Sequence, residues 1–340
     1  MRLRPQDPMR TKATDSGVED GWHGARIGAE TRDRARRAET RIHTGIDIGE
    51  PGRATVTIAF LALTLAATII EFATFGTSPT TSELSRSGGA GVGVVATGAW
   101  WKLLASNLLH ANVLHVAMNA FVIYLTGRWL EHLAGRAIMV ATILWSAIAA
   151  GVFGILVDTP SVSIGASGVA FGIVGCAIAI DPRARTATGL IARQLGVVNV
   201  VITFIAPGIS IGGHLGGLAA GLAVGALAWS RTRRDDDHPV GRPRRAAAAT
   251  LVAAWIPFAA IAVAGPSVLP GDLAHARGTL TASLLERQLS GATLSSGLKI
   301  DTASCTATSD LLVYDCDLDG RRGTVTFSTR DDQWSLATAR

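Results

Sequence analysis

The chain has 340 residues, of which 48% are hydrophobic and 17% are charged, with a formal net charge of +5 and a mean hydropathy of +0.34. The apolar residues come in long blocks, so the composition excludes an ordinary soluble globular protein and indicates an integral membrane protein. The excess of basic residues does not require a nucleic-acid partner, because membrane topology accounts for the same charges.

Residues 1–53 are polar, rich in arginine and poor in large apolar side chains. This composition predicts a disordered tail. The segment has no early apolar core, so we expect no cleavable signal peptide.

Seven later segments are apolar enough for membrane-spanning helices, which need roughly 20 residues. Their approximate bounds are 54–75, 112–131, 137–157, 167–181, 188–206, 211–229 and 247–269. The first six form a predicted helical core over 54–230, and the fourth of them is short and rich in glycine. The seventh follows a linker at 231–246 and contains Pro257, which membrane helices tolerate.

Arginine and lysine collect in alternate connections between these segments. Residues 231–245 alone hold six arginines, whereas the connections 76–100, 158–166 and 206–212 share one basic residue, Arg86. Connections rich in basic residues stay in the cytoplasm. We therefore expect a multi-pass protein of the cell membrane, with a cytoplasmic N-terminus and an extracytoplasmic C-terminus.

Residues 270–340 have a different pattern, typical of a small α+β domain. A short amphipathic helix is predicted at Leu280–Leu289, and Asp319-Gly320 fits a hairpin turn. Four short segments have β character: 298–303, 311–316, 322–328 and 333–338. The predicted fold is an all-α polytopic core of six helices, with a seventh transmembrane helix and a small α+β C-terminal domain.

The three cysteines fall in two environments. Cys176 lies inside the fourth span and is expected to be a packing residue. Cys305 and Cys316 lie in the C-terminal domain, which the predicted topology assigns to an oxidising space. We expect them to form a disulfide that stabilises a small core, although their spacing alone does not establish the bond.

Ser167 begins the fourth span, in the run Gly165-Ala166-Ser167-Gly168. The first turn of a helix has free N–H groups and the positive end of the helix dipole, which favour a negatively charged oxygen beside the serine. Gly165 and Gly168 permit close approach of neighbouring backbones. On this motif alone, a helix N-cap serine between packing glycines is the simpler interpretation.

His214 begins the sixth span, at the same predicted depth as Ser167. An ionisable residue inside a membrane is costly and by default functional. Small residues recur along both helices, at Gly213, Gly217, Gly221 and Gly225 and at Gly168, Gly172 and Gly175. Helices with such faces pack closely, which would bring the serine within reach of a histidine base. The alternative is a buried histidine bonded to a backbone carbonyl.

A third cluster, at the start of the second span, contains His110, His115 and Asn119. His115 and Asn119 are four residues apart and share a helix face, so their side chains could stabilise an oxyanion. The same cluster could in principle ligate zinc. Because it has no nearby carboxylate and no His-Glu-x-x-His motif, we expect neither a metal nor a cofactor.

The pattern His-x4-His-x3-Asn, then Gly-x-Ser-Gly, then a histidine at the head of a glycine-rich span, resembles the rhomboid family of intramembrane serine proteases. The resemblance covers about 54–230. It implies Ser167 as the nucleophile and His214 as the general base, without an acidic third member. It also implies an oxyanion site made of His115, Asn119 and the backbone N–H of Ser167.

The resemblance implies structural roles for other residues. His110 matches the family's first histidine, Phe171 matches an aromatic residue that packs on the catalytic histidine, and Glu131 matches a structural carboxylate. Trp101-Lys102 resembles a Trp-Arg pair of the first outer loop, where lysine cannot reproduce the bidentate contacts of arginine. The C-terminal domain resembles small two-cysteine extracytoplasmic domains of bacterial membrane proteins and lipoproteins.

The implied function is that of a serine-type endopeptidase that cleaves transmembrane proteins near the outer membrane face. Its partners would be transmembrane substrates and the lipid bilayer. The alternative from another class is a non-catalytic rhomboid-like scaffold that binds transmembrane helices, but inactive relatives usually lack the serine or the histidine. A transporter would show inverted repeats, which this sequence lacks.

Overall fold

The computed structural model describes residues 54–158, 162–205, 208–230, 242–256, 271–293, 299–308, 312–328 and 333–338. The predicted tail 1–53, most of the linker and residues 257–269 of the seventh predicted span lie outside these ranges.

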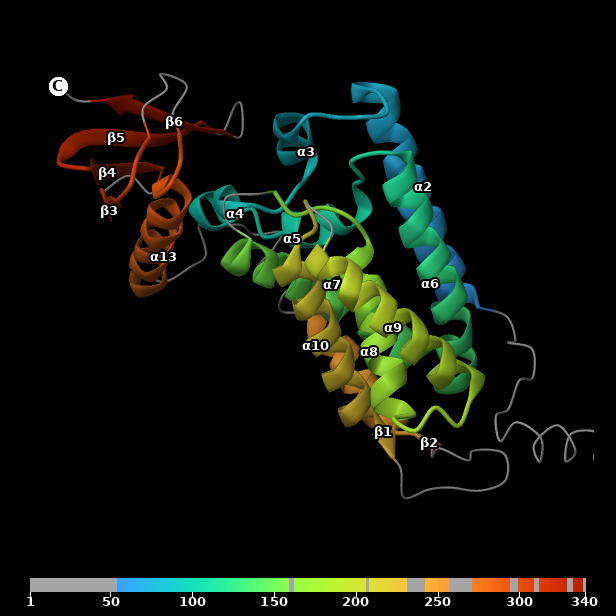
Figure 1. The fold of residues 1–340 in the computed structure, drawn as a ribbon. Helices are drawn as coiled ribbons and strands as arrows, with labels where there is room; N and C mark the ends of the chain where they lie inside the picture. Colours follow the sequence, from blue (N-terminus) through green and yellow to red (C-terminus); the bar gives the residue numbers. More distant parts are fainter. Residues whose placement is uncertain are drawn as a thin grey trace, which may run out of the picture. The chain divides into compact units, whose positions relative to one another are not determined.

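Six apolar helices make up the predicted core (Figure 1). They are α2 (Thr55–Phe75), α6 (Val113–Ala134), α7 (Arg136–Val157), α8 (Ser167–Ile180), α9 (Ala187–Ile205) and α10 (Ile211–Ala228). Within the described ranges, five of these are long and apolar enough to cross a membrane, and α8 is apolar but has 14 residues. The chain is therefore a multi-pass membrane protein of mainly helical fold, as predicted from its apolar blocks.

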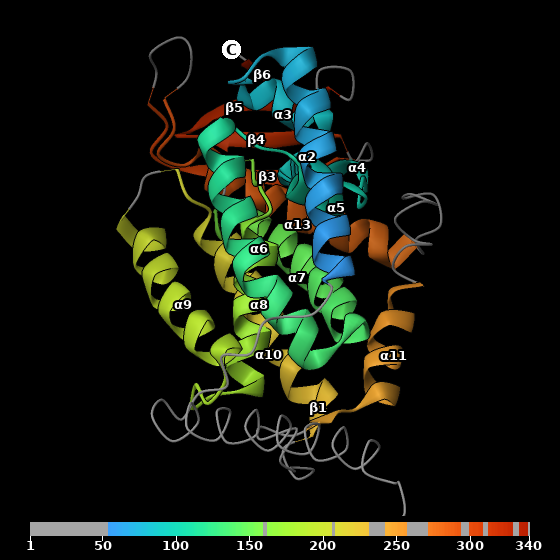
Figure 2. The same cartoon turned by 90° about the vertical axis from the view of Figure 1, so that its right-hand side faces the viewer.

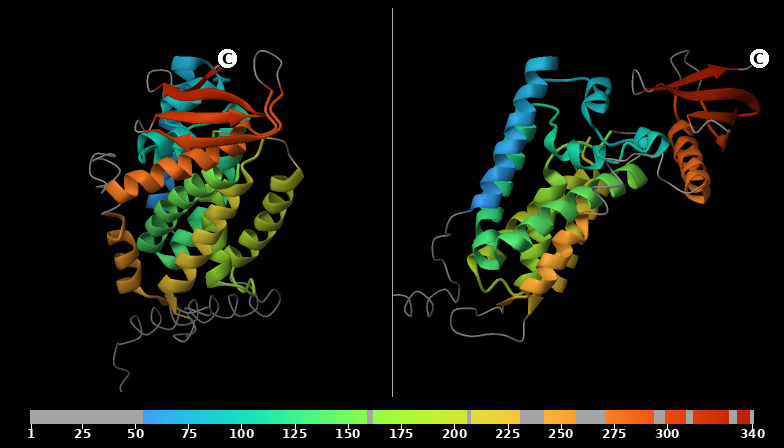
Figure 3. Two further views of the ribbon diagram at one scale, coloured as in Figure 1. Left: turned by 90° about the vertical axis from the view of Figure 1, so that its left-hand side faces the viewer. Right: turned by 180° about the vertical axis from the view of Figure 1, so that it is seen from behind.

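Helix α8 forms the centre of the core. Its residues other than Ser167 and Ile178 are all buried, as expected for a helix that is apolar on every side. Figures 2 and 3 show α9 on one side of the bundle and α11 (Arg245–Ala253) on the opposite side. Helix α11 begins where the seventh span is predicted, and it accepts a hydrogen bond from Trp145 of α7 at the Leu251 carbonyl oxygen.

Helices α8 and α10 touch through their backbones. A Cβ atom added to Gly217 would collide with the carbonyl oxygen of Gly168, and one added to Gly221 would collide with that of Gly172. Only glycine fits at these positions, so the predicted close packing of two small-residue faces is confirmed. This contact fixes the relative depth of the first turns of α8 and α10.

Glu131 joins α6 to the start of α2. Its buried carboxylate accepts hydrogen bonds from the backbone N–H groups of Val56 and Thr57, both at 2.9 Å, and from the Thr57 hydroxyl at 2.8 Å. These donors lie in the first turn of α2, which otherwise leaves its N–H groups without helical partners. The carboxylate therefore has the structural position expected from the sequence.

The segment between α2 and α6 contains four short helices. They are α3 (Thr81–Ser87), α4 (Val92–Thr97), α5 (Lys102–Ala105) and the 3₁₀ helix η1 (Ser106–Leu108). Thr80 and Glu83 form a capping box at the start of α3. The Lys102 ammonium group donates a hydrogen bond to the Ser85 carbonyl oxygen at 3.0 Å, so Lys102 joins two parts of this segment despite lacking the fork of arginine.

The C-terminal region is a small α+β unit. Helix α13 (Gly271–Leu289) precedes an antiparallel meander of β3 (Ala303–Ala307), β4 (Val313–Leu318), β5 (Arg321–Ser328) and β6 (Gln333–Thr338). Figure 3 shows α13 against one face of the sheet. Asp319 and Gly320 both have positive φ between β4 and β5, which confirms the predicted two-residue hairpin turn.

Two boundaries of the C-terminal unit differ from the sequence prediction by more than two residues. Helix α13 begins at Gly271 rather than Leu280, because tertiary context overrides the poor helix propensity of Gly278 and Thr279. The first strand is Ala303–Ala307 rather than 298–303. Ile300 is buried but lies in the preceding connection, where its backbone bonds to Gly291 and Ala292.

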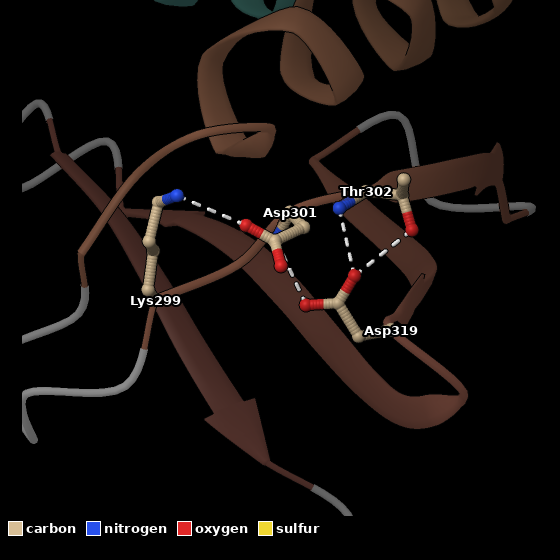
Figure 4. A network of polar contacts seen from close by, with 4 residues as sticks. All are labelled: Lys299, Asp301, Thr302 and Asp319. Carbon is tan, nitrogen blue, oxygen red and sulfur yellow. Dashed lines mark hydrogen bonds and ion pairs between the residues drawn. The ribbon is translucent and has the colours of Figure 1, made fainter.

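A disulfide and a set of hydrogen bonds stabilise the C-terminal unit. Cys305 and Cys316 are direct partners on β3 and β4 and form the expected disulfide, whereas Cys176 is buried in α8 with a free thiol. Figure 4 shows the Asp319 carboxylate accepting backbone hydrogen bonds from Asp301 at 2.9 Å and Thr302 at 2.7 Å. These two bonds, followed by one from the Thr302 hydroxyl, lower the pKa of Asp319 below its ordinary value.

The C-terminal unit packs against the short helix α4. Val92, Val94 and Val95 of α4 belong to the same buried cluster as Leu284 and Leu285 of α13. The contact is close enough that a Cβ atom at Gly93 would touch the ring of Phe327 at 2.7 Å. The segment between α2 and α6 and the C-terminal unit thus share one apolar core.

Candidate functional site

Ser167 lies in the first turn of α8, after a backbone turn at Gly165. Gly165 has a φ of +105°, which favours glycine, and its N–H donates to the Ser106 carbonyl oxygen at 2.8 Å. Ala166 is the N-cap residue, without a side-chain cap. The interpretation of Ser167 as an N-cap serine is therefore wrong, and its partly buried hydroxyl is not used to cap the helix.

His214 lies in the first turn of α10 and is 8% exposed. Ser210 caps this helix by accepting a hydrogen bond from the Gly213 N–H at 2.9 Å. The imidazole stacks on the ring of Phe171, with centroids 4.2 Å apart and an interplanar angle of 23°. Phe171 lies one turn after Ser167 on α8, so the nucleophile and base predicted from the sequence occupy adjacent first turns. Within the described residues no hydrogen bond joins them.

The carboxylate of Asp158, at the end of α7, anchors the start of α10. It accepts hydrogen bonds from the Ser210 hydroxyl and from the N–H groups of Gly212 at 3.0 Å and Gly213 at 3.4 Å. A carboxylate is favourable at a helix N-terminus because of the free N–H groups and the helix dipole. Asp158 therefore fixes the backbone immediately before His214.

His115 and Asn119 of α6 lie against the turn that leads to Ser167. A Cβ atom added to Gly165 would be 2.7 Å from Nε2 of His115 and 3.4 Å from Nδ2 of Asn119. Both polar groups thus lie beside the backbone two residues before the serine. The residues predicted to form an oxyanion site come together at this end of the core.

His110 is fully buried in a polar network. Its Nδ1 lies 3.0 Å from the Thr68 hydroxyl, and its Nε2 lies 3.1 Å from Nδ2 of Asn119 and 3.4 Å from the Ala166 nitrogen. Its backbone N–H donates to Glu71 at 3.0 Å. The contacts join α2, α6 and the turn before Ser167, which supports a structural role for this residue.

Ser167 also borders a small, partly open pocket with a volume of about 40 Å³. A site needs roughly 10–15 Å³ of such space to hold a water molecule. The pocket is lined by Met118, Asn119, Val122, Ser167, Ala170, Phe171, Val174, Gly196 and Asn199. Asn119 and Asn199 give it polar groups, so it can hold water next to the serine.

Comparison with known proteins agrees with this geometry. A family model described as Rhomboid domain matches residues 97–231, a range that contains every predicted site residue of the helical core. Residues 97–231 of the chain therefore match the rhomboid family. No group of three or more potential metal ligands occurs among the described residues.

Named rhomboid proteins are similar over parts of the chain. Rhomboid protease GluP of Bacillus subtilis (strain 168) is 28% identical over 192 residues, which cover 53% of this chain and 36% of the relative. Putative rhomboid protease YdcA of the same organism is 39% identical over 83 residues, covering 24% and 41%. Rhomboid-like protease 1 of Toxoplasma gondii is 29% identical over 179 residues, covering 49% and 59%. The chain thus spans less than half the length of the first two relatives.

Sequence reasoning missed two residues of this site. Thr203 of α9 bonds to His214 at 2.7 Å, and Asp158 holds the helix that carries it. Asp158 directly follows a predicted apolar span, and a carboxylate at that position could have been predicted to bind the end of a neighbouring helix. Thr203 gave no signal, since a threonine in a membrane helix usually bonds to its own backbone.

Proposed function

We propose that the protein is an intramembrane serine protease that cleaves transmembrane proteins near the outer membrane face. Support comes chiefly from one observation: Ser167 and His214 lie in the first turns of two helices whose backbones touch, and Phe171 of the serine's helix stacks on the histidine. The match of residues 97–231 to a family that includes named proteases supports the same reaction class.

In the proposed reaction, His214 Nε2 accepts the proton of Ser167 as Oγ attacks a peptide carbonyl carbon. The developing oxyanion receives hydrogen bonds from the Ser167 N–H and from the side chains of His115 and Asn119. Collapse of the tetrahedral intermediate breaks the C–N bond, and His214 passes its proton to the leaving amine. The product is an acyl-enzyme and a free amine.

The acyl-enzyme then reacts with water. The water oxygen attacks the ester carbonyl carbon while His214 accepts a proton from the water. His214 then passes this proton to Ser167 Oγ as the ester bond breaks. The pocket of about 40 Å³ beside Ser167 supplies space for this water. The hydrogen bond from Ser167 to His214 forms with bound substrate, since catalytic hydrogen bonds often tighten only in the complex.

The substrate must expose its carbonyl group. A transmembrane helix keeps its carbonyl oxygens in internal hydrogen bonds, so we expect cleavage where small or helix-breaking residues loosen the substrate. In this proposal the N-terminus is cytoplasmic and the C-terminal unit is extracytoplasmic, which agrees with its disulfide. We propose no cofactor, and no partner beyond such substrates and the bilayer.

The test compares wild type with Ser167→Ala and His214→Ala, reconstituted with a synthetic transmembrane substrate. Because nucleophile and base act as a unit, either change should abolish cleavage while the variant stays folded. A fluorophosphonate probe should label wild type and not Ser167→Ala. Turnover by Ser167→Ala near the wild-type rate would refute the proposal, and an unreactive, inactive wild type would favour the non-catalytic scaffold.

A further inference from the structure

The orientation of the His214 ring is set by a hydroxyl on a third helix. Nδ1 of His214 lies 2.7 Å from Oγ1 of Thr203 on α9. The same Oγ1 lies 2.8 Å from the carbonyl oxygen of Asn199, one turn earlier in α9. Thr203 is 3% exposed, so these contacts are shielded from bulk water.

The two contacts together determine where the protons lie. A hydroxyl group has one hydrogen to donate, and a carbonyl oxygen can only accept. The Thr203 hydrogen must therefore point to Asn199, because otherwise two acceptors would face each other at 2.8 Å. Oγ1 of Thr203 then accepts from His214, and the Nδ1 atom of His214 carries the hydrogen.

This tautomer has a chemical consequence. A neutral imidazole with its hydrogen on Nδ1 has an unprotonated Nε2, which is the atom that can accept a proton. In serine hydrolases the partner of Nδ1 holds the ring in this tautomer and orientation. Here the partner of Nδ1 is the neutral Thr203 hydroxyl, whose hydrogen is donated to the Asn199 carbonyl oxygen. Its oxygen can therefore only accept from Nδ1, and no carboxylate is needed to hold this tautomer.

We propose that Thr203 is a positioning residue of the site, which fixes the tautomer and orientation of His214 through its hydroxyl. The inference rests on the proposed function for its catalytic meaning, although the tautomer itself can be measured without activity. Thr203 acts through His214 and does not contact the reacting atoms. The residue also makes the orientation of the base depend on α9, a helix separate from those that carry Ser167 and His214.

The first experiment measures the tautomer directly. Protein labelled with ¹⁵N-histidine is examined by NMR in detergent, with His214→Gln used to assign the signals. We expect the wild-type protein to show a protonated Nδ1 and an unprotonated Nε2 for neutral His214. A hydrogen on Nε2 would overturn the inference, whatever the activity of the protein.

The second experiment uses matched variants. Thr203→Val keeps the shape of the side chain and removes the hydroxyl, whereas Thr203→Ser keeps the hydroxyl. The control Thr126→Val removes a similarly buried hydroxyl, which among the described residues bonds only to the Val122 carbonyl oxygen of its own helix, at 2.7 Å. A misplaced catalytic group costs about 100-fold, so Thr203→Val should lower kcat by about 10- to 100-fold with KM unchanged. Thr203→Ser should recover most of kcat, and Thr126→Val should match wild type.

The outcomes separate this inference from the proposed protease function. Wild-type kcat in Thr203→Val, or equal losses in Thr203→Val and Thr126→Val, would overturn the positioning role. If Thr203→Val fails to fold, Thr203→Ser provides the test. Loss of activity in this variant, together with a hydrogen on Nε2 of His214, would equally refute the positioning role of the hydroxyl. Cleavage that persists in Ser167→Ala would instead refute the protease itself, while leaving the measured tautomer intact.

Discussion

The contact between α8 and α10 leads to a quantitative prediction for Gly221→Ala. The added Cβ would lie 1.9 Å from the Gly172 carbonyl oxygen, whereas such contacts are essentially never found below 3.0 Å. The opposing atom is backbone and cannot rotate away, so the two helices must separate by about 1 Å. Overpacking of this kind typically destabilises a protein by about 1–3 kcal/mol.

The separation of α8 and α10 should also change the geometry of Ser167 and His214. Gly221 lies two turns from His214 on α10, so a separation of the two backbones also moves the histidine away from Ser167. A misplacement of about 1 Å can cost roughly 100-fold in rate. Gly221→Ala should therefore lose stability and most of its cleavage activity together.

The assays are reversible unfolding in mixed detergent and cleavage of the synthetic substrate. The matched control is Ala223→Val, which adds bulk to an exposed position of the same helix and should behave like wild type. Wild-type stability and cleavage in Gly221→Ala would show that the backbone contact does not set the geometry of the site.

Four further predictions follow from the described contacts. Asn119→Ala should lower kcat by about 100- to 1000-fold, as loss of one oxyanion donor usually does. Asp158→Asn should lower the free energy of unfolding in detergent by about 1–3 kcal/mol, because charge-assisted hydrogen bonds to the start of α10 are weakened. Replacing Cys305 and Cys316 with serine should cost the C-terminal unit about 2–4 kcal/mol, and non-reducing mass spectrometry should detect the linked peptides. Asp319 should titrate in NMR below the ordinary aspartate pKa of 3.8, so its stabilising effect is present above that value and is lost as the pH falls through the folded-state pKa.

Each of these has a clear contrary result. An unchanged kcat would remove Asn119 from the oxyanion site, and wild-type stability in Asp158→Asn would mean that the cap on α10 contributes little. Free thiols on Cys305 and Cys316 would contradict the disulfide. An Asp319 pKa at or above 3.8 would mean that the bonds from Asp301 and Thr302 do not persist in solution.

The sequence predicted the membrane helices well because a bilayer leaves the backbone few alternatives. Apolar blocks of sufficient length must be helical there, and the predicted bounds of α2, α6 and α7 differ from those observed by three residues at most. The convergence of Ser167 and His214 was also predictable, since recurring glycines identify the faces of α8 and α10 that meet. These signals are local periodicities, which a single sequence displays.

Contacts that depend on one side chain meeting another helix were not predictable. Thr203 looks like any threonine of a membrane helix, and only the packing of α9 brings it to His214. In the C-terminal unit, the segment 298–303 was predicted as a strand, but its residue Ile300 is buried in the connection between α13 and β3. Burial alone does not distinguish a strand from a well-packed connection.

The cluster shared by α4 and α13 has a consequence for how the protein is made. Val92, Val94 and Val95 leave the ribosome long before Leu284 and Leu285, which cover them in the finished protein. Contacts between such distant parts of a chain form slowly, so the valines of α4 stay exposed until α13 has been synthesised and packs on them. A nascent chain released before α13 would carry this apolar surface uncovered, and quality-control proteases and chaperones recognise surfaces of that kind.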